Sequence, residues 1–123
     1  MHILDTSAVL ELVLGTEKGE KLKQHIGGSP MGVTSLTIHE LLVGLRETEM
    51  ELLSHFFHEV AVLPFDKEAA QKSARIEKQL RKEGRMINKM DILIAGICLF
   101  HNHELLTCDL DFSRVKELQL KIF

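Results

Sequence analysis

Residues 2–14 run HILDTSAVLELVL and are followed by Gly15. The first four residues form a short apolar run that ends in the acid Asp5, a pattern typical of a buried strand. The two hydroxyl residues that come next open an apolar helix, which Gly15 closes. A strand that passes directly into a helix is the repeating unit of a parallel sheet covered by helices.

The same strand and helix pattern recurs along the rest of the chain. Ser35, Asp66 and Asn88 each stand where a helix is expected to begin. Further helices are expected at residues 17–26, 36–46, 47–58, 67–83 and 89–102, and strands at 31–34, 60–63, 104–107 and 118–123. Because alternating strands and helices favour right-handed crossovers, the sequence predicts one α/β domain, residues 1–123. Its expected architecture is a three-layer α/β/α sandwich with a central parallel sheet.

Composition excludes several classes of protein. The chain has 123 residues, 45% of them hydrophobic, which suits one domain because a chain of this size buries about two thirds of its surface on folding. Fifteen Lys and Arg against eighteen Asp and Glu give a net charge of −3, which excludes a uniformly basic nucleic-acid binder. The longest apolar run, residues 92–100, is far shorter than the roughly 20 residues of a membrane span. With two cysteines and no signal peptide, a cytoplasmic protein without a membrane anchor is expected.

Four acids are expected to meet at one edge of this sheet. The first ends a strand, the next two lie in helices and the last follows a strand: Asp5, Glu40, Asp91 and Asp109. In an open parallel sheet, ligands bind beyond the carboxyl ends of the strands. Carboxylates gathered there repel one another unless they are protonated or neutralised by a cation, and their oxygens suit Mg²⁺ or Mn²⁺. The sequence therefore predicts a magnesium or manganese site.

Each acid also has a purely structural interpretation. Asp5 is placed to cap the helix that follows it, and Asp91 has capping-box spacing from the asparagine three residues before it. Glu40 is compatible with a solvent-exposed position, and segment 109–111 with a turn or cap before residues 113–117. A capping carboxylate can also face a metal ion, so these roles do not exclude a metal site.

Four short motifs resemble, in order and spacing, those of the PIN-domain family. They are ILDTS at 3–7, HELLVG at 39–44, DILIAG at 91–96 and LTCDLDF at 106–112. The resemblance spans essentially the whole chain, whose length is similar to that of the stand-alone VapC-type toxins of prokaryotic toxin–antitoxin pairs. It implies a PIN-like fold and a metal-dependent endoribonuclease that hydrolyses RNA phosphodiester bonds with Mg²⁺ or Mn²⁺.

The resemblance also implies roles for individual residues. Catalysis and metal binding map onto Asp5, Glu40, Asp91 and Asp109. Asp111 belongs to the acid–Phe pair that closes the last motif, and it is expected to support the site. It also stays an alternative to Asp109 as the fourth acid. The hydroxyls expected to orient the carboxylates or the scissile phosphate are those of Thr6, Ser7 and Thr107. Glu40 would either bind the metal or help to deprotonate the attacking water.

An RNA substrate requires positive charge near these acids. Basic residues recur at steps of three and four along the helix at 67–83 and continue beyond it toward Asp91. Another basic residue, Arg46, follows Gly44. The predicted RNA-binding residues are Arg46, Lys82, Arg85 and Lys89. The same stripe has a structural interpretation as the solvated face opposite Ile76 and Leu80.

The resemblance implies two protein partners. One is an antitoxin that covers the acids with an Arg or Lys and contacts the helices at 17–26 and 47–58. The other is a second copy of the chain, because small proteins of this kind pair as homodimers.

Other functions remain open. The same site would serve an RNA-processing nuclease without an antitoxin, and the same fold would serve a nonhydrolytic RNA-binding or adaptor module. A phosphoacceptor receiver domain is disfavoured because the chain lacks paired acids after its first strand and a final helix. A zinc site is disfavoured because its spacing matches no common zinc module; the four residues considered for it are Cys98, His101, His103 and Cys108.

Overall fold

The computed structural model describes residues 1–123 and confirms the predicted α/β fold. Five short strands form one sheet in the order β3-β2-β1-β4-β5, and every neighbouring pair is parallel. The strands are β1 His2–Leu4, β2 Met31–Thr34, β3 Ala61–Leu63, β4 Glu104–Thr107 and β5 Leu120–Ile122. The helices are α1 Thr6–Leu14, α2 Glu17–Ile26, α3 Ser35–Gly44, α4 Glu47–Glu59, α5 Lys67–Glu83 and α6 Lys89–His101, with a 3₁₀ helix η1 at Leu110–Arg114.

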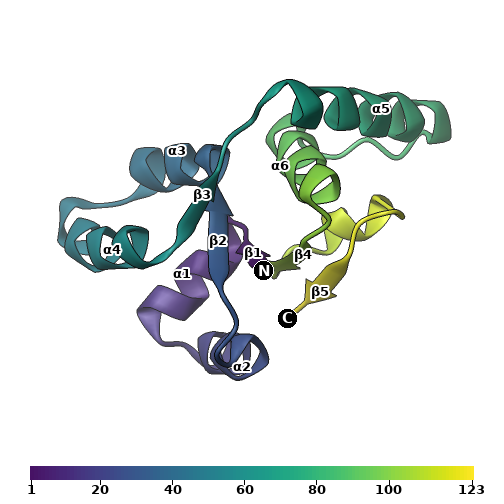
Figure 1. Cartoon of the computed structure of the whole chain (residues 1–123). Coiled ribbons are helices and arrows are strands. Elements are labelled where there is room, and N and C mark those ends of the chain that lie inside the picture. The colour runs from purple at the N-terminus through teal and green to yellow at the C-terminus, as the bar shows by residue number, and fades with distance from the viewer.

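Helices cover both faces of the sheet and complete the three layers. In Figure 1, α3 and α4 lie to the left of β2 and β3, and α5 and α6 lie to the upper right of these two strands. Successive strand residues point to opposite faces, so Ile3 packs into the core under α5 and α6 whereas Leu4 packs into the core under α1, α2 and α4. Leu105 and Leu106 of β4 divide in the same way. No helix combines the length and the apolar character needed to cross a membrane.

Helix α6 is held close against α5 by a glycine. A Cβ atom built on Gly96 would lie 2.8 Å from the carbonyl oxygen of Ala69 and 2.7 Å from Cβ of Ser73, so only glycine fits at this contact. The residues of α6 from Ile94 to Cys98 are all buried, which matches a helix that is apolar nearly all round. This packing fixes the first turn of α6, where Asp91 lies.

Some element boundaries differ from the expected ones. Helix α3 begins at Ser35, because the hydroxyl of Thr34, not that of Ser35, accepts the backbone N–H of Thr37 at 3.1 Å. Helix α6 ends one residue early, since Asn102 adopts a left-handed backbone with φ 56°. The expected last strand at 118–123 is shortened to β5, because residues 120–122 stand opposite β4 in register. Beyond them only single backbone hydrogen bonds reach β4, at Gln119 and Phe123.

Candidate active site

Asp5 is a buried carboxylate at the carboxyl end of β1, with 5% of its surface exposed. One carboxylate oxygen accepts the backbone N–H of Ala8 at 2.9 Å, as the N-cap of α1, and also the hydroxyl of Ser7 at 2.7 Å. The other oxygen accepts the hydroxyl of Thr107 at the end of β4. Burial raises the pKa of Asp5, and these hydrogen bonds oppose that rise. Asp5 therefore caps a helix and also presents a fixed carboxylate at the sheet edge.

Hydroxyl groups tie the strand ends around Asp5 together. Ser7 Oγ accepts the backbone N–H of Cys108 at 2.9 Å, and Thr107 Oγ1 accepts the backbone N–H of Asp109 at 3.0 Å. Thr6 Oγ1 donates to Glu40 Oε1 at 2.9 Å, which joins α1 to α3. All three predicted hydroxyls thus contact one of the acids, directly or through the backbone beside it.

The four predicted acids line one hollow of about 380 Å³, which we call the acidic hollow. Its carboxylates come from the end of β1, from α3, from the first turn of α6 and from the residue before η1, and they belong to Asp5, Glu40, Asp91 and Asp109. The remaining lining residues are Thr6, Ser7, Leu10 and Asn88. The chain thus gathers four carboxylates that lie up to 104 residues apart in sequence.

Electrostatic repulsion is concentrated on Asp91. Burial and then the negative charges of Asp109 and Glu40 raise the pKa of Asp91 from 3.8 to about 7, with Asp5 and Asp111 adding smaller effects. No hydrogen bond joins the Asp91 carboxylate to Asn88, whose side chain instead accepts the backbone N–H of Met90 at 2.8 Å. The capping-box interpretation of Asp91 is therefore wrong, and its carboxylate is left to face the other acids.

Asp109 and Asp111 occupy different positions. Asp109 lines the acidic hollow, and its Oδ1 also accepts the backbone N–H of Asp111 at 2.9 Å as the N-cap of η1. Asp111 is not among the lining residues; its side chain is 48% exposed and lies 3.8 Å from the guanidinium of Arg114. This placement favours Asp109 as the fourth acid.

The donor set of the acidic hollow fits a hard divalent cation. All its charged groups are carboxylates, and the neighbouring polar groups are hydroxyls and the Asn88 side chain. Mg²⁺ and Mn²⁺ prefer such oxygen ligands, and a cation there would relieve the repulsion that raises the pKa of Asp91.

Asn88 lines the acidic hollow but was not predicted as a site residue. The only feature of the sequence that pointed to it is its position three residues before Asp91.

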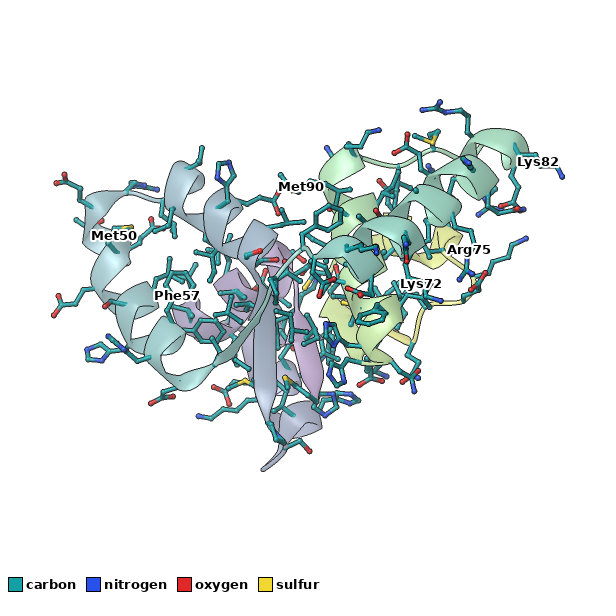
Figure 2. All side chains as sticks on the ribbon, turned by 45° about the horizontal axis from the view of Figure 1, so that its top comes forward. Met50, Phe57, Lys72, Arg75, Lys82 and Met90 are labelled. Atoms are coloured by element: carbon teal, nitrogen blue, oxygen red, sulfur yellow. The ribbon has the colours of Figure 1, made fainter.

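The predicted RNA-binding cations do not form one continuous track. Lys89 Nζ lies 2.6 Å from Glu77 Oε1, and Arg46 Nε lies 3.4 Å from Glu49 Oε1. Figure 2 shows Lys82 near the end of α5, well away from Met90 at the start of α6. Ile76 and Leu80 are buried on the opposite face, as the solvated-face interpretation requires, and the RNA-binding roles, including that of Arg85, stay predictions.

The disfavoured zinc set of two cysteines and two histidines does not assemble, but another histidine group does. Cys98 is fully buried in α6, and none of the four residues considered belongs to a group able to share a metal ion. His2, His25 and Glu104 do form such a group. His2 and Glu104 share a feature visible in the sequence, because each stands at the first position of an expected strand, and the structure places them opposite each other in parallel β1 and β4. Nothing in the sequence pointed to His25.

Comparison with known proteins identifies the family to which the chain belongs. The PIN domain family matches residues 2–118. Ribonuclease VapC3 of Methanocaldococcus jannaschii is 33% identical over 96 residues, which cover 77% of this chain and 95% of that relative. VapBC2 from Rickettsia felis, solved bound to a DNA fragment from its promoter, aligns with a TM-score of 0.87 and 18% identity, covering 99% of this chain and 98% of that one. VapBC-5 from Mycobacterium tuberculosis, a member of the VapBC family of toxin–antitoxin systems, aligns with a TM-score of 0.75 and 22% identity, covering 99% and 96%. With the family matching nearly its whole length, the chain belongs to the PIN domain family.

Proposed function

We propose that residues 1–123 act as one domain, a metal-dependent endoribonuclease that is the toxin of a toxin–antitoxin pair. The observation that carries the proposal is the acidic hollow, where carboxylates from four separate elements converge. The name of the VapC3 relative, a ribonuclease, supports RNA as the substrate. The acidic hollow also favours catalysis over a nonhydrolytic binding module. A carboxylate cluster that binds no cation destabilises the fold by repulsion, so a module that only binds RNA would gain nothing from keeping it.

The residues of the hollow divide the work between binding and proton transfer. Asp5, Asp91 and Asp109 would hold Mg²⁺ or Mn²⁺. When bound, the cation supplies positive charge that offsets the charge of the phosphodiester and activates water for attack. Glu40, held through one oxygen by Thr6, is placed either to complete the ligand set or to accept a proton from the attacking water. The fixed hydrogen bonds around Asp5 keep its carboxylate oriented without a ligand.

An antitoxin is the partner we propose for a second surface. Residues of α2 and α4, the two helices expected to contact an antitoxin, line a hollow of about 490 Å³ together with the end of α1. Ile26, Leu52 and Phe56 contribute apolar surface there, and Lys23 and Glu20 contribute charge. An amphipathic antitoxin helix suits such a surface, because its apolar face would enter the hollow while its polar face pairs at the rim. Because α2 lies toward the opposite edge of the sheet, the basic side chains that reach the acidic hollow would come from another part of the antitoxin. We also propose that the toxin acts as a homodimer in the cytoplasm.

The test is cleavage of end-labelled structured RNAs by the purified chain with Mn²⁺, with Mg²⁺ and with EDTA. Asp91→Asn is prepared identically, and Asp111→Asn is the matched control because that carboxylate lies outside the acidic hollow. We expect cleavage with either metal, none with EDTA, none by Asp91→Asn, and clear residual cleavage by Asp111→Asn. Equal cleavage by the wild type and Asp91→Asn would identify a contaminating ribonuclease. RNA binding without cleavage under either metal would favour the nonhydrolytic module instead.

If cleavage occurs, a further comparison separates a toxin from a processing nuclease. Expression of the active chain in bacteria without its partner should arrest growth, and co-expression of a small protein encoded beside its gene should restore growth. An active nuclease that leaves growth unaffected would support the RNA-processing alternative.

A further inference from the structure

Two histidines and a glutamate converge at the amino end of the sheet, the edge opposite the acidic hollow. His2 opens β1 and Glu104 opens β4, and the parallel pairing of these strands sets the two residues side by side. His25 reaches them from the last turn of α2. His2 Nδ1 and His25 Nε2 each lie 2.9 Å from the same atom, Glu104 Oε1. We call these three residues the histidine cluster.

The histidine cluster is held by the fold and not only by its own contacts. The backbone pairing of β1 with β4 fixes the separation of His2 from Glu104. Helix α2 is anchored by Leu22 and Ile26, which are buried in the core under α1, α2 and α4. The His25 ring also packs edge-on against Phe123, with ring centroids 5.6 Å apart. The backbone positions of all three residues are therefore set by the fold without a ligand, which favours a metal site.

The geometry suits a tetrahedral metal ion with little rearrangement. The three donor atoms lie within 4.8 Å of one another. At zinc-to-ligand distances of about 2.0–2.1 Å, tetrahedral donors stand about 3.3 Å apart. Each imidazole nitrogen would therefore withdraw from Glu104 Oε1 by about 0.4 Å, and the two nitrogens, which lie within 4.8 Å of each other, would settle at about 3.3 Å. The side chains of His2, His25 and Glu104 are 20%, 31% and 30% exposed, which leaves an open path for an ion and room for a water ligand.

We propose that His2, His25 and Glu104 bind a divalent transition metal, with Zn²⁺ the best match. Imidazole nitrogens suit Zn²⁺, Ni²⁺ and Cu²⁺, whereas Mg²⁺ prefers an all-oxygen set. Two histidines and one glutamate are a known zinc ligand combination, with water in the fourth position. The bound ion would join α2 to the start of β1 and β4. Because α2 also forms one wall of the proposed antitoxin hollow, the ion would stiffen that wall.

The experiment uses the full chain without a histidine tag, stripped of metal with EDTA and transferred to excess Mg²⁺ to occupy oxygen sites. ZnCl₂ is then added while the imidazole resonances of all seven histidines are followed by NMR. We expect the His2 and His25 signals, and no others, to change in step with the first equivalent of zinc. Thermal unfolding in the same samples should show a zinc-dependent rise in Tm.

Four variants locate the ion. His25→Ala and Glu104→Gln should each weaken zinc binding about 100-fold. Loss of a residue that only orients a metal ligand costs about 10–100-fold, and loss of a ligand itself should cost at least as much. His58→Ala, which removes an exposed histidine in the last turn of α4, should bind zinc as the wild type does. Absence of a histidine response in the wild type would overturn the proposal. So would unchanged affinity in His25→Ala, or zinc binding that is lost in Asp91→Asn and retained in His25→Ala.

Discussion

Replacing Asp91 with asparagine should make the metal-free protein more stable while it abolishes RNA cleavage. The Asp91 carboxylate has a pKa of about 7, raised by burial and by the acids around it, whereas in the unfolded chain it ionises near 3.8. Ionised Asp91 therefore destabilises the folded protein at neutral pH. Asparagine keeps the shape of the side chain but removes the charge, so the repulsion disappears together with the metal ligand.

The size of the effect follows from the pKa difference of about 3 units. At 1.36 kcal/mol per unit the upper bound is about 4 kcal/mol, and water in the open hollow screens this to about 1–2 kcal/mol. Between about pH 4 and pH 7 the unfolded chain has lost the proton and folded Asp91 still holds it, so wild-type stability falls as pH rises through that range. The gain from Asp91→Asn is therefore absent near pH 4 and complete above about pH 7.

The assay is thermal and urea unfolding in EDTA across this pH range, for the wild type, Asp91→Asn and the control Asp111→Asn. Above about pH 7 we expect Asp91→Asn to raise Tm by about 4–8 °C, and Asp111→Asn to change it much less, since that side chain is 48% exposed beside Arg114. Saturating Mn²⁺ should then stabilise the wild type by about 3 kcal/mol at 100 times Kd and Asp91→Asn far less. A gain that is absent, or that does not fade toward acid pH, would refute the electrostatic argument.

Three further predictions concern the same site and its supports. Mn²⁺ affinity, measured by calorimetry, should rise up to about tenfold per pH unit below pH 7 and level off above it, because Asp91 must lose its proton to bind the ion. An affinity that does not change with pH would contradict that role. Thr107→Val should lower the free energy of unfolding by about 1–3 kcal/mol in urea titrations, because Asp5 loses a buried donor; no loss would show that this hydrogen bond is dispensable. Gly96→Ala should cost about 1–3 kcal/mol because its Cβ meets α5, whereas Gly28→Ala, with open space around its Cβ, should cost little; equal effects would contradict the packing.

The parts of the structure that could be predicted from the sequence are those with a local physical cause. Strand and helix order follows from short apolar runs alternating with capped helices, and Asp66 caps α5 as expected, its side chain accepting the backbone N–H of Ala69 at 2.9 Å. Because all strands are parallel, residues that follow them gather at one edge. The convergence of Asp5 and Asp109 on one hollow follows from that topology alone.

The parts that could not be predicted depend on how side chains orient after the chain has folded. Asp109 and Asp111 are two residues apart, and although the resemblance favours Asp109, the sequence leaves Asp111 open as an alternative fourth acid. The 3₁₀ helix η1 separates them, because capping by Asp109 turns Asp111 outward toward Arg114. The direction of α5 likewise decides how far Lys82 lies from Met90 at the start of α6, and helical spacing alone does not give that direction. The outward direction of the Asp111 side chain and the position of Lys82 could therefore be seen only in the folded structure.

The two ends of the sheet differ in the metal chemistry that they offer. At the carboxyl end, loops and helix starts bring together carboxylates, whose hard oxygens select Mg²⁺ or Mn²⁺. At the amino end, the register of β1 with β4 and the end of α2 bring together two imidazoles and one carboxylate, which select Zn²⁺ over Mg²⁺. Because the donor atoms differ, loading one site with its preferred ion should leave the other free. Metal titrations with Mg²⁺ and Zn²⁺ should then report two independent events, and loss of Asp91 or His25 should remove one event each.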